Sequence, residues 1–273
     1  MALSACANSS RAPGGIAGEP NKQPGSQEMS YRYDGRFYDA NVKMNAPSAM
    51  KVVGVLLLAW PIRSVLDVGC ARGIWLSKWA EAGVNDFHGV DGLHVDDDRL
   101  LIERSHFTPA DLGSGFDLGR EFDLVQSLEV AEHLPGSASA AFVALLVRHS
   151  RGLVLFSAAP PGQGGENHIN EQSYDFWRGH FRDWGYHAID WIRPRLTGDK
   201  AVSYWYRYNL ILYASEPMME RLPADVLRSK VPEDEPIPDV SPRLFRARKQ
   251  LMRALPPSLI VALVRMKAQF YSR

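Results

Sequence analysis

The chain has 273 residues, of which 45% are hydrophobic and 23% are charged, so it holds enough apolar material for one sizeable core with appendages. Lys and Arg together number 31, as do Asp and Glu, so the formal net charge is zero and no global basic field favours nucleic acid. Two cysteines, Cys6 and Cys70, cannot build a disulfide framework or a zinc-type cluster, which fits a reducing, cytoplasmic setting.

The first 28 residues are rich in Ala, Ser, Gly, Pro and Asn and contain almost no large apolar side chains. Such a segment cannot offset the entropy of ordering, so residues 1–28 are predicted to form a disordered arm. The first helix is predicted from Pro47 to Trp60, because proline favours the first helical position and apolar residues follow at helical spacing.

From Ser64 onward, short apolar runs alternate with amphipathic stretches. Strands are predicted at 64–68, 87–91, 107–112, 122–127, 152–158, 186–192 and 207–214, and helices at 74–82, 138–149 and 171–184. Alternation of this kind is typical of a parallel sheet covered by helices. The predicted fold class is therefore α/β: a Rossmann-like, seven-stranded, mainly parallel sheet with helices on both faces, within a domain at residues 29–215.

Residues 216–242 carry six prolines among charged residues, which predicts a Pro-rich linker or an irregular surface segment. Residues 243–273 form a basic amphipathic segment with eight Lys and Arg and no acidic residue. Segments of this kind lie on anionic membrane surfaces, or pack on their own domain with the charges solvated. Peripheral contact with the inner membrane face through residues 243–273 is thus one of two interpretations that stay open.

A strand that runs into a turn of small residues marks the predicted ligand site, where residues 65–73 read VLDVGCARG. In an open α/β sheet, ligands bind at the carboxyl ends of the strands, and glycines let the backbone approach a ligand closely. Asp91 ends the second predicted strand, where a carboxylate can accept both hydroxyls of a ribose. A nicotinamide cofactor would instead require G-x-G-x-x-G, which the sequence after Val68 does not supply.

These residues resemble the class I S-adenosylmethionine (SAM)-dependent methyltransferases, in particular the type 11/23 O-methyltransferases, over residues from about 47 to 214. The family's glycine-rich first motif matches residues 67–73, and its fourth-strand motif matches residues 122–128. Its ribose-binding acid matches Asp91 and its adenine-edge acid matches Asp111, whereas Ala71 stands where the family has its central glycine. The resemblance implies a SAM site formed by Asp67, Gly69, Gly73, Asp91, Asp111, Leu112 and Ser127.

Two glutamates and two histidines follow the fourth and fifth predicted strands. If residues 129–135, which read EVAEHLP, form a helical turn, Glu129, Glu132 and His133 share one face, because positions i, i+3 and i+4 lie together. The Gly-rich loop 160–170 borders the same sheet edge and can bring His168 inward. Carboxylates and imidazoles are suitable ligands for Mg²⁺, Mn²⁺ or Zn²⁺, and such a cation would lower the pKa of an acceptor hydroxyl.

The Glu-x-x-Glu-His pattern with a later histidine resembles metal-dependent O-methyltransferases that act on RNA ribose 2′-hydroxyls, and is similar to ubiquinone-pathway O-methyltransferases. A metal-free interpretation stays open, in which Glu129 binds a backbone N–H near the cofactor and His133 caps the turn before Pro135. In another, His168 is a metal-free general base, since histidine titrates near neutral pH. The candidate catalytic residues are therefore His168 and His133.

The sequence predicts a SAM-dependent methyltransferase that modifies a hydroxyl of a glycan or small-molecule acceptor, because no extended basic face favours RNA. Metal-assisted ribose 2′-O-methylation of RNA is the alternative enzyme activity. A non-catalytic, SAM-binding and membrane-associated partner protein is the alternative from another class. The aromatic run at residues 204–206 either lines a substrate pocket or packs around the last predicted hairpin.

Overall fold

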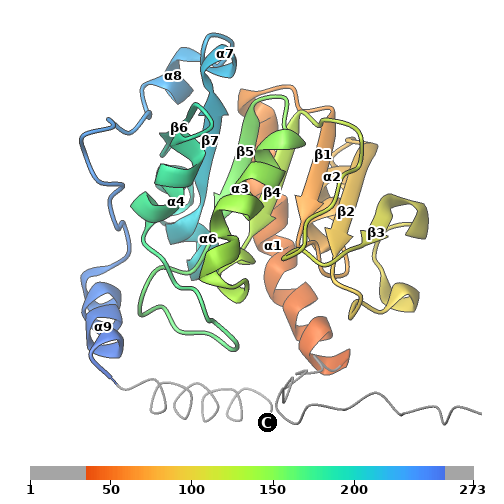
Figure 1. Ribbon diagram of the computed structural model, residues 1–273, viewed down its shortest axis with the longest axis horizontal. Coiled ribbons are helices and arrows are strands. Elements are labelled where there is room, and N and C mark those ends of the chain that lie inside the picture. The colour runs from red at the N-terminus through yellow and green to blue at the C-terminus, as the bar shows by residue number, and fades with distance from the viewer. Residues whose placement is uncertain (1–34, 256–273) are drawn as a thin grey trace, which may run out of the picture. The chain divides into compact units, whose positions relative to one another are not determined.

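The computed structural model describes residues 35–255, with side chains from residue 44 onward except that of Asp97. The predicted disordered arm and the last part of the basic segment lie outside the described residues. A seven-stranded sheet forms the centre of the domain, in the order β3-β2-β1-β4-β5-β7-β6 (Figure 1). Its strands are β1 (Ser64–Val68), β2 (Asp86–Asp91), β3 (Phe107–Pro109), β4 (Leu124–Leu128), β5 (Leu153–Ser157), β6 (Tyr186–Ile189) and β7 (Ile211–Ser215).

The five strands from β3 to β5 pair in parallel, and β7 runs antiparallel to both β5 and β6. The predicted α/β class and the mainly parallel, seven-stranded sheet are therefore confirmed. Strand order reverses beside β1, which pairs with β2 on one side and with β4 on the other. This switch point places the turn after β1 at the edge where open α/β sheets bind ligands.

Helices cover both faces of the sheet because the central strands are apolar on both sides. On one face, α1 (Gly35–Ala59) and α2 (Ile74–Glu81) bury Val52 and Trp79 against the sheet. On the other face, α3 (Ser139–Arg148) and α4 (Tyr174–Arg182) bury Phe142 and Trp177. The shorter helical segments are the 3₁₀ turns Asp97–Arg99, Arg104–His106, Ala131–His133 and Gly136–Ala138, and α5 (Arg193–Leu196), α6 (Tyr204–Asn209), α7 (Glu216–Met219), α8 (Ala224–Leu227) and α9 (Arg243–Arg253).

Two predicted elements differ most from the structure, while β3, β6 and α4 are shorter than predicted. The first helix begins at Gly35, so Pro47 lies inside α1 and not at its start. A proline removes one backbone hydrogen bond from a helix, and burial of the apolar face that follows it offsets this cost. Residues 204–209 form α6 where a strand was predicted from 207, because aromatic residues are common in strands and their pattern here misled the prediction.

The Pro-rich segment 216–242 packs against the domain as an irregular surface segment, so it is not a free linker. The backbone N–H of Val231 donates to the carbonyl of Ala188, and Val231 itself is buried. The guanidinium of Arg178 donates to the carbonyls of Pro232 and Glu235. Beyond this segment, α9 also packs on the domain, and Phe245 lies 5.0 Å from Tyr204 between ring centroids. Within residues 35–255, none of the helices has the length and apolar character needed to cross a membrane.

Candidate active site

The turn between β1 and α2 is shaped by residues with left-handed backbone conformations. Gly69 and Gly73 have φ angles of 87° and 81°, which glycine adopts without steric cost. A Cβ atom at Gly69 would collide with the side chain of Val130, so only glycine fits at this position. Ala71 also has a positive φ, 48°, and therefore takes the conformation of the glycine that the family usually has there.

Asp91 lies at the carboxyl end of β2 and holds this turn. Its Oδ2 accepts a hydrogen bond from the backbone N–H of Ala71, and its Oδ1 accepts one from the N–H of Gly92, both at 2.6 Å. Burial raises the pKa of the Asp91 carboxyl, and the two backbone N–H groups oppose that shift. The carboxylate thus stands beside the glycine-rich turn, as the sequence predicted.

Asp67 and Ser127 are the last residues but one of β1 and β4, which pair in parallel, and both are buried. Neither Oδ2 of Asp67 nor Oγ of Ser127 has a hydrogen-bond partner among the residues that the structure describes. Burial raises the pKa of Asp67 from 3.8 to about 7, although the side chain of Gln126 opposes the shift. Buried polar atoms without partners are uncommon in folded proteins, so these two atoms are suited to bind a polar ligand.

Asp111 and Leu112 follow β3 on the same edge. The Asp111 carboxylate accepts hydrogen bonds from the Ser114 hydroxyl at 2.6 Å and from the Gly113 N–H at 2.9 Å. These bonds, that of the Ser114 side chain first, lower the pKa of Asp111. The carboxylate is exposed and ionised, and Leu112 packs at the margin of the core beside α3. Both residues therefore lie near the predicted cofactor edge, while the Asp111 side chain also stabilises its own loop.

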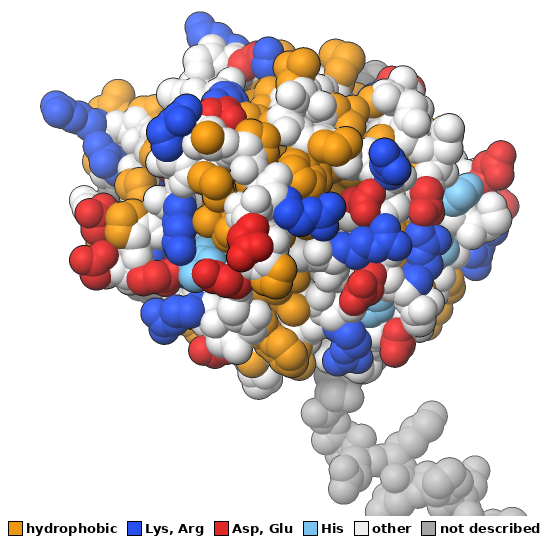
Figure 2. All heavy atoms as spheres, turned by 90° about the horizontal axis from the view of Figure 1, so that it is seen from above, with side chains coloured by type: hydrophobic (Ala, Val, Ile, Leu, Met, Phe, Trp, Pro, Cys, Tyr) orange, Lys and Arg blue, Asp and Glu red, His pale blue; other side chains and the backbone are white. Residues whose placement is uncertain are grey.

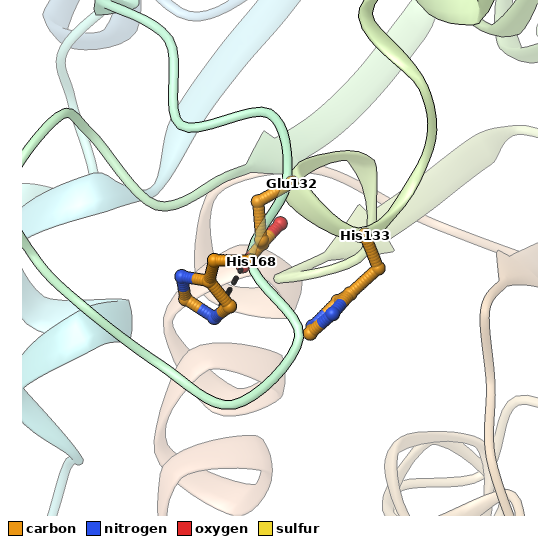
Figure 3. Close-up of side chains that lie close together, drawn as sticks. All are labelled: Glu132, His133 and His168. Atoms are coloured by element: carbon orange, nitrogen blue, oxygen red, sulfur yellow. Dashed lines mark ion pairs between the residues drawn. The ribbon is translucent and has the colours of Figure 1, made fainter. Parts of the chain in front are cut away.

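A second group of polar residues lies beyond β4 and β5. Ala131–His133 form a 3₁₀ turn after β4, and the loop between β5 and α4 carries His168. Ligand atoms of Glu132, His133 and His168 lie within 4.8 Å of one another (Figure 3). The carbonyl of Glu132 accepts hydrogen bonds from the N–H groups of Ile169 and Asn170, which fixes the loop against the turn.

Both imidazole rings are oriented by a hydrogen bond to Nδ1. In His168 this atom lies 2.9 Å from Oε1 of Glu171, and in His133 it lies 3.2 Å from the carbonyl oxygen of Asn167. These partners are acceptors, so they favour the tautomer with the proton on Nδ1 and a lone pair on Nε2. Burial, followed by the nearby His168, lowers the pKa of His133 to about 4, so this ring is uncharged at neutral pH.

Glu132 is fully buried, and neither of its carboxylate oxygens has a hydrogen-bond partner within residues 35–255. Burial raises its pKa well above the usual range, and the neighbouring Glu129 raises it further. A buried carboxylate needs a positive partner to remain ionised. A solvent-shielded carboxylate between two oriented imidazoles therefore fits the ligand set of a divalent cation.

Glu129 does not belong to this compact cluster, although it was predicted as a fourth ligand. Its two carboxylate oxygens accept hydrogen bonds from the side-chain amides of Gln163, at 3.0 Å, and Asn209, at 3.1 Å. The backbone of Glu129 has a φ of 57°, an uncommon value for a residue with a side chain. Gln163 and Asn209 were not predicted, because nothing local in the sequence indicates that their amides meet Glu129.

A family model described as a methyltransferase domain matches residues 22–198. The chain belongs to the class I SAM-dependent methyltransferase family. It is 31% identical over 105 residues to a ubiquinone biosynthesis O-methyltransferase of Hydrogenovibrio crunogenus, a match that covers 35% of this chain and 42% of that protein. The chain thus aligns with less than half of the length of this curated relative.

Solved structures of methyltransferases share the fold of this family member. A sugar N-methyltransferase from Streptoalloteichus sp. ATCC 53650 has a TM-score of 0.53 at 19% identity, covering 74% of this chain and 99% of that one. An O-methyltransferase family protein from Burkholderia thailandensis has a TM-score of 0.50 at 16% identity, covering 66% and 58%. At these identities the likeness concerns the fold alone.

Proposed function

We propose that this methyltransferase transfers the methyl group of SAM to a hydroxyl oxygen of a glycan or small-molecule acceptor, assisted by a divalent cation. The observation that carries the proposal is the cluster of Glu132, His133 and His168, in which a buried carboxylate and two imidazoles have ligand atoms within 4.8 Å of one another. Attack by a hydroxyl requires loss of its proton. A carboxylate and two imidazoles at the carboxyl edge of the sheet could promote the loss of that proton.

The residues at the carboxyl ends of β1, β2 and β4 would hold SAM. Asp91 accepts the ribose hydroxyls with the lone pairs that Ala71 and Gly92 leave free. Asp67 and Ser127 offer unpartnered buried oxygens to the amino-acid end of the cofactor, and Asp67 ionises when the SAM ammonium approaches. Gly69 and Gly73 keep the turn free of side chains, while Asp111 and Leu112 border the adenine.

Glu132 and the Nε2 atoms of His133 and His168 would hold the cation. When bound, a divalent cation lowers the pKa of an acceptor hydroxyl and orients it towards the methyl group. Glu129 lies next to these ligands, and its charge affects the pKa of Glu132. The amides of Gln163 and Asn209 keep Glu129 in place. Burial raises the pKa of the Glu129 carboxyl, and these hydrogen bonds oppose the shift.

A metal-free mechanism at the same residues is the second candidate. Glu171 binds Nδ1 of His168, which leaves Nε2 as the basic atom, and such a pairing supports a general base. His133 is poorly suited to this role, because its lowered pKa of about 4 makes it a weak base. The two mechanisms assign different roles to His168 and are separated by their response to chelators.

The acceptor is assigned to the glycan and small-molecule class on the distribution of charge. On the sheet edge opposite to the candidate site, basic and acidic side chains are interspersed (Figure 2). The formal net charge of the chain is zero, so no global basic field favours an RNA backbone. Metal-assisted methylation of an RNA ribose remains the alternative activity, because it would use the same cluster of Glu132, His133 and His168.

The test combines cofactor binding with turnover. Titration calorimetry should show binding of SAM and none of NAD. Release of S-adenosylhomocysteine should appear with one member of a panel of sugars, glycans, phenols and short RNAs, and should stop in excess chelator. Unchanged turnover in chelator would leave His168 as the base. Bound SAM without turnover on any acceptor would favour a non-catalytic SAM-binding protein.

A further inference from the structure

The outward side of α9 exposes apolar side chains at helical spacing. Leu244 is 86% exposed and Leu251 is 65% exposed, and the two lie seven positions apart, which is two helical turns. Ala247 lies between them and is also exposed. The inward side holds Phe245 and Met252 against the domain, so both sides of this helix carry apolar residues.

The charge of α9 is positive and largely uncompensated. The helix contains five Lys and Arg and no acidic residue. Among the described residues, Asp239 is the one acidic partner of the helix, and it binds Lys249 at 2.6 Å. Arg248 and Arg253 donate to the backbone carbonyls of Gln163 and Pro161, which bear no net charge. The guanidinium charges therefore remain available to an anionic partner.

The inward side of α9 lies on the loop between β5 and α4, which carries His168 and is called the acceptor loop. The bonds from Arg248 and Arg253 reach the start of that loop, next to Gln163 and ahead of His168. A helix with side chains is about 10 Å across, so the acceptor loop lies about one helix diameter behind Leu244 and Leu251. Figure 1 shows α9 at the same end of the sheet as this loop.

We propose that α9 binds an anionic membrane surface, with Leu244 and Leu251 inserted at the level of the lipid headgroups. Arg243, which flanks Leu244, and Arg246, two positions beyond Leu244, are both exposed on α9. Near such a surface, each Lys or Arg contributes about 1 kcal/mol, equivalent to roughly a fivefold gain in affinity. Exposed leucines favour lipid over RNA, because a phosphate backbone offers no apolar phase to bury them.

This orientation also assigns a class of acceptor, a step that rests on the proposed function. The loop with His168 would lie about one helix diameter from the membrane, so a hydroxyl of a lipid-linked head group would reach it. A lipid-linked glycan fits both the hydroxyl chemistry of the site and the surface to which α9 binds. Binding to the membrane is measured without turnover, so it stands or falls separately from the methyl transfer.

The experiment is sedimentation of the full chain with vesicles of phosphatidylcholine, with and without phosphatidylglycerol. The protein should bind only the anionic vesicles at low salt, and about 1 M salt should release it, since the Debye length is then only about 3 Å. Arg243→Glu/Arg246→Glu should weaken binding by about tenfold or more, and Leu244→Ser/Leu251→Ser should do the same. SAM binding should be unchanged in both variants.

The matched controls carry the same changes on other surfaces. Lys200→Glu/Arg228→Glu alters the net charge equally at exposed positions outside α9, and Leu58→Ser removes a leucine that is 90% exposed on α1. Both controls should bind vesicles like the unaltered protein. Equal losses in controls and α9 variants would overturn the proposal, as would full-chain protein that ignores anionic vesicles. So would α9-dependent binding to RNA or to a second copy of the chain in place of vesicles.

Discussion

Nε2 of His168 lies 4.0 Å from Oε1 of Glu132, a carboxylate that is fully shielded from solvent. The two side chains come from different loops, and Glu171 orients the imidazole from the other side. Burial raises the pKa of this carboxyl well above its usual range, so a proton would compete with a cation for it. Binding of a cation would therefore displace a proton from Glu132.

The first prediction concerns Glu132. Glu132→Gln removes the charge but keeps the size of the side chain, so the affinity for Mn²⁺ should fall by about a hundredfold, while SAM binding stays the same. Glu220→Gln, at an exposed position, is the control and should bind Mn²⁺ normally. Calorimetry measures both affinities. If Glu132→Gln binds Mn²⁺ as the unaltered protein does, the cluster is not a metal site.

The pH dependence of cation binding is the second prediction. The raised pKa of Glu132 means that protons compete with the cation, so the affinity should rise with pH until the carboxyl is ionised. His133 adds nothing to this pH dependence near neutral pH, because its pKa of about 4 leaves the ring uncharged there. Mn²⁺ titrations from acid to mildly alkaline pH measure this trend. An affinity that is flat with pH would contradict the assignment of Glu132 as a ligand.

The third prediction joins stability and function at Asp67. In the folded protein Asp67 keeps its proton up to about pH 7, whereas the unfolded chain releases it near 3.8. Ionisation thus favours the unfolded chain as the pH rises from 4 to 7, and the free energy of unfolding falls by about 4 kcal/mol in total. Asp67→Asn should recover up to that amount at pH 8 and nothing at pH 4, as measured by urea unfolding.

The same variant should bind SAM about ten- to a hundredfold more weakly, because an amide cannot pair with the SAM ammonium as a carboxylate does. Asp234→Asn is the control for a general effect of removing negative charge, since Asp234 is exposed. It should change neither stability nor SAM binding. An Asp67→Asn protein with higher stability and unaltered SAM affinity would show that Asp67 has no role in holding the cofactor.

Asp91 gives the fourth prediction. Asp91→Asn leaves one acceptor oxygen for the two backbone N–H groups of Ala71 and Gly92, so the free energy of unfolding should fall by about 1–3 kcal/mol. SAM affinity should fall about ten- to a hundredfold, because the ribose loses a charged acceptor. Asp98→Asn, exposed in the following loop, is the comparison. Unchanged SAM affinity in Asp91→Asn would place the ribose elsewhere.

The fifth prediction concerns the ion pair between Lys249 and Asp239, in which the ammonium group is buried. Lys249→Met should loosen α9 from the acceptor loop, so that amide hydrogen exchange quickens at residues 162–165 while β1 and β2 stay protected. Lys249→Met/Asp239→Asn should recover part of the protection, because it removes the carboxylate left unpaired. Faster exchange spread evenly over the whole domain would indicate general destabilisation and no specific support of the loop.

The sequence was most informative where local constraints decide the structure. Short, mostly apolar runs such as those of β1 and β4 predict buried strands, and every residue of both strands is buried. The positive φ of Gly69 explains why a glycine marks the turn. Sequence reasoning also predicted that Glu129, Glu132, His133 and His168 lie together at one sheet edge, and the structure brings together Glu132, His133 and His168. Their assignment to a metal stays a prediction.

The amide contacts were beyond the reach of sequence reasoning. Gln163 and Asn209 meet Glu129 from a distant loop and a distant helix, and such contacts depend on tertiary packing. Tyr206 shows why α6 was missed, since its aromatic ring suits a strand equally well. In the structure this segment is the helix α6, and the Tyr206 ring packs against Trp75 of α2 at 5.0 Å between ring centroids.

The close approach of α9 to the acceptor loop also restricts which residue can occupy position 162 in related sequences. A Cβ atom at Gly162 would collide with the backbone carbonyl of Lys249, and backbone cannot move aside as a long side chain can. A relative with a C-terminal helix in this position must therefore keep glycine at the equivalent of Gly162. A relative without that helix is released from this steric constraint, so this single site reports, without any structure, whether the C-terminal helix covers the loop.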